Sequence, residues 1–199
     1  MLPSTAPIPD SRLAVAAEAI AVRVSPPALV SHCRRTYAFG AALLQRSGRS
    51  FDAELLYVAA MLHDLGLTEE FEDGVTPFEQ RSAEVAGQAL ITAGATPAAV
   101  ALVHDAIAQH LDADAADDPR PEVAGVSIGA AVDVLGLRIF DLPAALVADV
   151  IERYPRLGFK TMLTEAIVRQ VQLKPQSQIA RHVKRYDFIA LVDAAPFAD

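Results

Sequence analysis

Helix start signals recur along this 199-residue chain, and they constrain its fold more than any other feature. A capping residue precedes proline in "SPP" (25–27), "TP" (96–97) and "DLP" (141–143), and a helix tolerates proline in its first turn. The segment "TPFE" (76–79) has the Thr and Glu spacing of a capping box. Apolar residues between these signals recur at helical spacing, and no segment alternates as a strand would. The pattern predicts an all-α fold.

Glycine and proline indicate where these helices begin and end. We expect helices over residues 11–22, 27–46, 52–64, 77–93, 97–110 and 122–136, one that begins at 141–143, and two more over 160–173 and 177–193. Residues 1–24 are interpreted as an N-terminal segment with the first helix, and residues 25–199 as the main helical domain with a C-terminal helical extension. A hydrophobic content of 52% is enough for one core, so we expect a single compact domain.

Composition narrows the class of partner. The formal net charge of −8 argues against a nucleic-acid or anionic-membrane surface, which leaves a small-molecule substrate and room for a buried face in a homo-oligomer. Cys33 is the only cysteine, and the N-terminus lacks a signal-peptide pattern, so we expect a cytoplasmic protein. The apolar run 123–137 is shorter than the roughly 20 residues of a membrane helix and contains Asp133, so it is interpreted as a core helix.

Several polar residues interrupt apolar segments. His63 and Asp64 lie within "YVAAMLHDLGLTEEF" (57–71), and Asp133 lies in the predicted core helix. Taken singly, each aspartate is explained by a helix cap or by a salt bridge to a neighbouring arginine. His32, however, shares a helical face with apolar Leu29 and should also point inward. Two imidazoles and two carboxylates on inward-facing helices form a nitrogen and oxygen ligand set suited to a divalent ion.

The order His32, then His63 with Asp64, then Asp133 resembles the ligand order of the HD-domain superfamily of metal-dependent hydrolases. The blocks "SHCRRTYAFG", "LYVAAMLHDLGLTEEF", "FEQRSAEVAGQAL", "DAIAQH" and "VDVLGLRIFDLP" are similar to those of its cyanamide hydratase-like branch. The resemblance implies an HD-domain helical bundle with one metal ion between its core helices. It also implies that all four residues are metal ligands and that His110 is a pocket histidine.

A bound ion would lower the pKa of a coordinated water to about 7, and that water would attack a small electrophile such as cyanamide or a nitrile. Asp64 would hold this water, and His110 would donate a proton or a hydrogen bond to the developing anion. Zn or Fe is the favoured metal, with Mn, Co and Ni as alternatives, and the number of ions stays open.

Two other functions stay open. A phosphohydrolase acting on a phosphomonoester or nucleotide would use the same ion, but many phosphohydrolases of the superfamily have a lysine where this chain has Leu67. The third is a non-catalytic HD-like binding module with a structural ion. Outside the ligand set, we interpret His104 and His182 as surface residues and Lys160 as structural, and the roles of Arg35 and Arg138 stay open.

Overall fold

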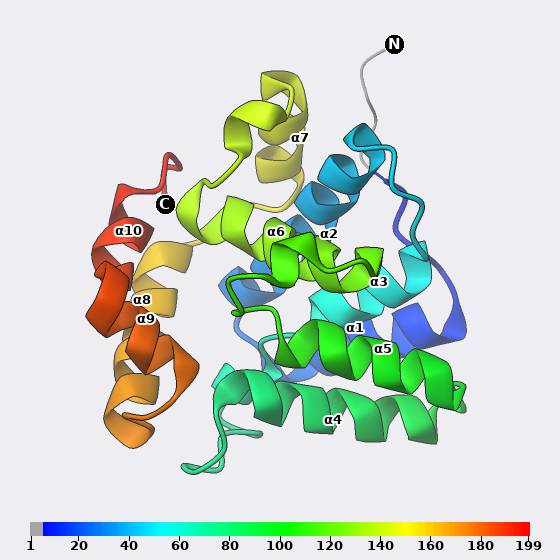
Figure 1. The fold of residues 1–199 in the computed structure, drawn as a ribbon, viewed down its shortest axis with the longest axis horizontal. Helices are drawn as coiled ribbons and strands as arrows, with labels where there is room; N and C mark the ends of the chain where they lie inside the picture. The colour runs from blue at the N-terminus through cyan, green and yellow to red at the C-terminus, as the bar shows by residue number, and fades with distance from the viewer. Residues whose placement is uncertain (1–5) are drawn as a thin grey trace.

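The computed structural model describes residues 6–199, so the first five residues of the predicted N-terminal segment lie outside the described residues. These residues form ten α-helices and three short 3₁₀ helices, with no strand among them, which confirms the predicted all-α class (Figure 1). The α-helices are α1 (Arg12–Val24), α2 (Pro27–Arg46), α3 (Ala53–Leu62), α4 (Phe78–Thr92), α5 (Pro97–Ala108), α6 (Pro121–Leu135), α7 (Ala144–Arg153), α8 (Phe159–Leu173), α9 (Gln178–Tyr186) and α10 (Phe188–Ala194). The 3₁₀ helices are η1 (Leu65–Leu67), η2 (Ala115–Asp117) and η3 (Ile139–Asp141).

Side-chain capping explains four of the ten helix starts among the described residues, those of α1, α3, α5 and α9. The side chains of Ser11, Asp52 and Thr96 cap α1, α3 and α5 by accepting a hydrogen bond from a backbone N–H three residues later. The predicted capping box at 76–79 does not form. Helix α4 begins at Phe78, one residue later than the box requires, and the side chain of Glu79 is buried in place of capping.

The predicted helix over 177–193 is wrong, because two helices occupy this segment. Asp187 has a left-handed backbone conformation with φ of 51°, and it ends α9 and begins α10. A right-handed helix cannot continue through a residue in that conformation. The break turns α10 back so that it packs against both α8 and α9.

Helices α2 and α6 cross at the centre of the molecule, and glycine allows their close approach (Figure 1). A Cβ at Gly40 would lie 2.2 Å from the carbonyl oxygen of Gly125, and a Cβ at Gly129 would lie 2.1 Å from that of Thr36. Thr36 and Gly40 are one turn apart on α2, as Gly125 and Gly129 are on α6, so the helices are antiparallel in this register. The next step along the register places His32 opposite Asp133.

The remaining helices surround this crossing. Helix α3 packs against α1, α2 and α5, and α4 and α5 lie side by side along one edge (Figure 1). Helices α8, α9 and α10 form a separate layer on one side of α2 and α6. A second cluster of buried apolar residues joins this layer to the core, and it contains Leu29, Val134 and Phe159.

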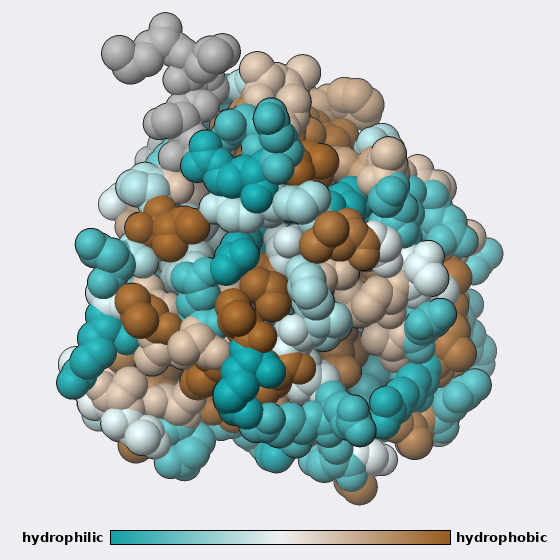
Figure 2. Space-filling view, turned by 180° about the vertical axis from the view of Figure 1, so that it is seen from behind, coloured by the Kyte–Doolittle hydropathy of each residue, from teal (hydrophilic) through white to brown (hydrophobic). Residues whose placement is uncertain are grey.

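The surface mixes polar and apolar residues. On the face opposite to that of Figure 1, separate apolar patches lie between hydrophilic side chains (Figure 2). Within residues 6–199, none of the helices combines the length and the hydropathy that crossing a membrane requires.

Candidate metal centre

His32 lies on the inner face of α2 and is 1% exposed. Phe159, the first residue of α8, stacks on its ring with the centroids 4.5 Å apart. The Nδ1 atom of His32 lies 2.7 Å from Oδ2 of Asp133. Burial opposes protonation of His32, but its contacts with the carboxylates of Asp133 and Asp64 outweigh burial and raise the pKa of the ring.

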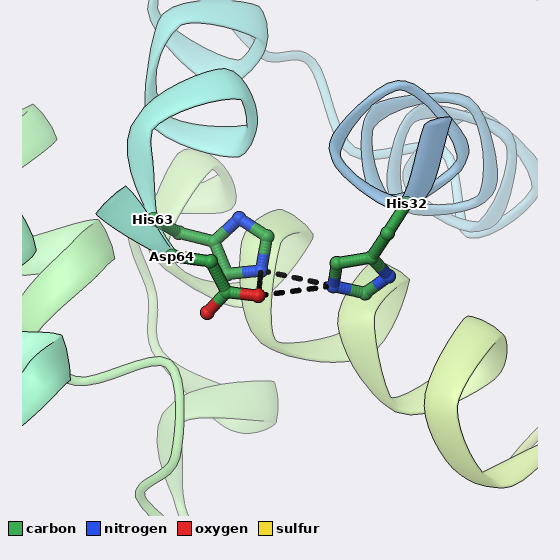
Figure 3. A group of neighbouring side chains, drawn as sticks. All are labelled: His32, His63 and Asp64. Atoms are coloured by element: carbon green, nitrogen blue, oxygen red, sulfur yellow. Dashed lines mark hydrogen bonds and ion pairs between the residues drawn. The ribbon is translucent and has the colours of Figure 1, made fainter. Parts of the chain in front are cut away.

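His63 and Asp64 follow the last turn of α3 and point toward His32 (Figure 3). The Nδ1 atom of His63 donates a hydrogen bond of 2.8 Å to the carbonyl oxygen of Ala60, one of the orphan carbonyls at a helix end. Helix α3 gives way to η1 after Asp64, and this turn directs its carboxylate to the same side as His63.

The three side chains converge on one point. The Nε2 atoms of His32 and His63 are 3.2 Å apart, and Oδ2 of Asp64 lies 3.4 and 3.3 Å from them. All three ligand atoms lie within 4.8 Å of one another, a spacing that a single metal ion can span. The structure therefore brings together His32, His63 and Asp64, three of the four residues predicted as ligands.

His110 extends this cluster. It follows the end of α5, and its Nδ1 donates a hydrogen bond of 2.7 Å to the carbonyl oxygen of Ile107. Its Nε2 atom lies 3.9 Å from Oδ1 of Asp64, and its ring is 5.0 Å from that of His63. Burial and the nearby His63 lower the pKa of His110 to about 4, so the ring is neutral at pH 7.

Hydrogen bonding fixes which ring nitrogen carries the proton when each of the three imidazoles is neutral. Each Nδ1 donates to a group that can only accept there, so each neutral imidazole has its lone pair on Nε2. When all three rings are neutral, their Nε2 lone pairs and the carboxylate of Asp64 thus face one another without a donor among them. Lone pairs 3.2 Å apart repel unless a proton or a cation lies between them, so this donor set fits a divalent metal ion.

Asp133 belongs to the cluster but lies behind His32. Its carboxylate accepts hydrogen bonds from Arg35 at 2.7 and 2.8 Å, from Arg156 at 2.9 Å and from Nδ1 of His32. Burial opposes its charge, but His32 and Arg35 outweigh burial and hold the pKa of Asp133 far below its usual value. The described contacts occupy both oxygens, an arrangement that favours orientation of His32 over the direct ligation implied by the resemblance.

Comparison with protein families identifies the fold that carries this centre. The family model described as HD domain matches residues 29–135, which is more than half of the chain and includes all five clustered residues. The chain belongs to the HD domain family. None of the curated proteins searched matches it. HD domains are commonly metal-dependent hydrolases, and the convergence of His32, His63 and Asp64 is compatible with such a centre.

A cavity of about 380 Å³ adjoins the candidate metal centre of this HD domain. Its wall includes His32, His63, Asp64 and His110, and most of the remaining wall is apolar. Part of that wall comes from α6 and part from α8, α9 and α10. The last three helices lie beyond the matched HD domain residues.

Several residues lie where the sequence did not predict them. His182, interpreted as a surface residue, lines the cavity together with Tyr186, one turn later on α9. Arg156 contacts Asp133 and is 3% exposed, and no sequence signal marked it. His182 and Tyr186 are four residues apart on the same helical face as Ile179, and this spacing is the signal that could have placed both on the side of α9 that lines the cavity, where Tyr186 is 47% exposed.

Other residues considered from the sequence lie outside the cluster. His104 is exposed beside Asp105, as predicted. Arg138 pairs with Asp141 on the surface, and Lys160 donates to backbone carbonyls near the C-terminus, a structural role.

Proposed function

We propose that this HD domain protein is a metal-dependent hydrolase or hydratase that adds water to a neutral carbon electrophile such as a nitrile or cyanamide. One observation carries the proposal. Three imidazole Nε2 lone pairs and one carboxylate meet in the wall of a cavity large enough for a small-molecule substrate. A purely structural centre would not need such a cavity beside its ligands.

His32, His63 and Asp64 would hold the ion, and Zn²⁺ or Fe²⁺ suits two imidazoles and a carboxylate. When bound, the ion supplies a water that is acidic enough to be deprotonated near neutral pH. Asp133 keeps Nδ1 of His32 protonated, which leaves Nε2 free for the ion. The buried side chains of Arg35 and Arg156 neutralise the charge of Asp133, so its carboxylate stays ionised while it accepts the hydrogen bond from His32.

His110 is the group that we assign to proton transfer. With Nδ1 bound to the carbonyl oxygen of Ile107, its Nε2 can accept a proton but has none to donate. This differs from the donor role predicted from the sequence. In the proposed reaction, a C–O bond forms between water and the nitrile carbon, one C–N π bond breaks, and the nitrogen gains a proton. His110 accepts the proton that water loses and then returns it to that nitrogen.

The choice of a neutral carbon electrophile rests on the charges around the cavity. Among the described residues, no lysine or arginine lines it, while Asp64 and Asp112 do. A phosphate ester would therefore enter a wall with carboxylates and without a basic side chain, and Leu67 stands where many phosphohydrolases of the superfamily have lysine. Cyanamide and simple nitriles are the smallest neutral molecules of the proposed class.

The first experiment counts metal in purified protein and in a His63→Ala, Asp64→Ala double variant. We expect about one Zn or Fe ion per chain in the parent after reloading and none in the variant. The matched control is His104→Ala, Asp105→Ala, which removes the second, exposed His-Asp dipeptide of the chain and should keep the ion. Equal metal content in all three proteins would overturn the proposed centre.

The second experiment measures turnover by the metal-loaded parent. We expect urea from cyanamide and the corresponding amide from nitriles, with loss of activity in His110→Ala. Release of phosphate from p-nitrophenyl phosphate, with no reaction of any nitrile, would replace the proposal with a phosphohydrolase. A stoichiometric ion without turnover of either class would support a non-catalytic HD module.

A further inference from the structure

Small residues on one face of α6 create the cavity beside the metal centre. Ser127, Ala130, Ala131, Val134 and Leu135 line it, at positions i, i+3, i+4, i+7 and i+8 of the helix. This spacing forms one continuous face. The first three side chains are too short to fill the gap to the opposite helices, so the space is a consequence of this sequence and not of loose packing elsewhere.

The opposite wall comes from the C-terminal layer. Leu163 and Ile167 are one turn apart on α8, and Phe188 and Leu191 lie three residues apart on α10. On α9, His182 and Tyr186 add one polar group each to a wall that is otherwise apolar. All of these side chains lie beyond residue 135, where the match to the HD domain family ends.

Volume and charge together define the occupant. The cavity of about 380 Å³ is roughly two and a half times the size of one that holds benzene, which corresponds to a ligand of on the order of 15 non-hydrogen atoms. Cyanamide would leave most of this space without contact. A charged ligand would lose its hydration beside apolar side chains, and among the described residues that line the wall no lysine or arginine would pair with an anion away from the proposed ion.

We propose that the substrate is a neutral organic molecule with a large apolar body, and that helices α8, α9 and α10 form the wall that selects it. The inference rests on the proposed function, since the reactive group would lie at the metal centre. The apolar body would extend along the small-residue face of α6, and its burial would supply most of the binding free energy. His182 and Tyr186 are specificity-determining residues that can hydrogen-bond one polar group on that body.

The test measures binding of prodan, a neutral naphthalene dye of suitable size, by its fluorescence in Zn²⁺-loaded protein. We expect saturable binding of one dye per chain. Ala131→Leu adds three carbons inside the cavity and should weaken binding at least tenfold. The matched control is Ala148→Leu on the exposed face of α7, away from the cavity, and it should bind like the parent. Anilinonaphthalene sulfonate, a related anionic dye, should bind at least tenfold more weakly than prodan.

Failure of this inference can be told apart from failure of the proposed function. Cyanamide turnover without saturable prodan binding would leave the reaction standing and overturn the apolar substrate class. Prodan binding that is unchanged by Ala131→Leu would place the dye elsewhere and also overturn it. Binding that follows the expected pattern, in a protein without nitrile turnover, would support the apolar ligand and reject only the reaction.

Discussion

At the scale of single residues, the metal centre depends on what binds the far side of each imidazole. Backbone carbonyls at helix ends fix Nδ1 of His63 and His110, whereas a carboxylate fixes Nδ1 of His32. A carboxylate partner makes an imidazole a stronger ligand than a carbonyl partner does. His32 is therefore expected to be the strongest nitrogen ligand of the metal ion, and Asp133 is the residue that strengthens it.

Asp133→Asn tests this assignment. Asparagine keeps the shape but leaves Arg35 buried without a counter-charge and Arg156 with only Asp199 at 3.9 Å, so the free energy of unfolding of the metal-free protein should fall by about 3–5 kcal/mol. Chemical denaturation measures this change. Because Asp133 orients His32 in our assignment and does not bind the ion, metal affinity should fall by roughly 10- to 100-fold while one ion per chain still binds at saturation.

Asp64→Asn is the comparison for that variant. Asp64 has no arginine partner among the described residues and points at the ligand atoms, so its loss should abolish metal binding with a smaller effect on the stability of the metal-free protein. A folded Asp133→Asn protein that binds no metal at millimolar concentration would identify Asp133 as a direct ligand.

The sequence indicated His32, His63, Asp64 and Asp133 because each lies in an apolar segment or on an apolar helical face, which is a local signal, whereas only the family resemblance indicated His110. It did not indicate which of their neighbours would partner them. Arg156 lies in an irregular segment between α7 and α8, and only the folded chain brings it to Asp133. The pairing of His32 with Asp133 likewise depends on the register of two helices, which no single segment encodes.

At the scale of helices, that register is set by the crossing of α2 and α6. The contacts of Thr36 with Gly129 and of Gly40 with Gly125 are repeated one turn further on as His32 with Asp133. Glycine at the crossing thus controls how far apart the histidine and the aspartate lie. The stability of the fold and the geometry of the metal centre share the same few contacts.

Gly129→Ala should disturb both the stability of the fold and the geometry of the metal centre. The added Cβ would meet a backbone oxygen, which cannot move independently of α2, so we expect a loss of about 3 kcal/mol in the free energy of unfolding, the upper end of ordinary overpacking. The helices should separate, and metal affinity should fall with stability. Thermal or chemical denaturation and a metal titration measure the two effects.

Gly87→Ala on α4 is the matched control. Its added Cβ would lie 3.8 Å from a side-chain atom of Val100, an ordinary contact, and alanine favours the helix by about 0.5–1 kcal/mol. This variant should be as stable as the parent or more so. Equal effects of the two substitutions would show that the crossing does not depend on glycine at position 129.

The presence of most helices was predictable because capping residues and apolar spacing are signals within a short stretch of sequence. The caps at Ser11, Asp52 and Thr96 are examples. The start of α4 and the break between α9 and α10 could not be predicted from the sequence. The start of α4 moved by one residue, which removed Glu79 from the capping position and buried it. Asp187 adopts a conformation that is rare for residues other than glycine, and nothing in its neighbourhood marks it as a break.

At the scale of the whole molecule, the C-terminal layer is tied to the HD core by a buried ion pair. Nζ of Lys174, the residue directly after α8, lies 2.5 Å from Oε1 of Glu72 in the loop before α4, and both side chains are about 5% exposed or less. Gln170 also donates to Glu72, and so does the backbone N–H of Gly74. Burial opposes the charge of Glu72, but these partners outweigh it and lower its pKa below the usual 4.5.

The ion pair should make stability depend on pH. A carboxyl group with a lowered pKa in the folded state stabilises the fold above its unfolded pKa, and this contribution is lost as the pH falls through the folded-state value. Glu72→Gln should therefore lower the free energy of unfolding by about 3 kcal/mol at pH 7, because Lys174 is left buried and unpaired. The difference from the parent should shrink progressively as the pH falls below 4.5.

Urea denaturation of both proteins between pH 7 and pH 3 measures this dependence. Glu165→Gln, an exposed position on helix α8, is the control and should change stability by less than about 0.5 kcal/mol at any of these pH values. A Glu72→Gln difference that stays constant down to pH 3 would mean that the ionised carboxylate is not what stabilises the contact.

The burial of the donor atoms also bears on how the protein acquires its ion. The ligands come from segments that meet only in the folded chain, and their side chains are at most 5% exposed beside a largely apolar cavity. A hydrated cation that approaches through this cavity must shed water next to side chains most of which offer no substitute oxygen. Loading and exchange should therefore be slow. The metal found in the isolated protein would then reflect which ion was abundant when the chain folded more than the equilibrium order of affinities.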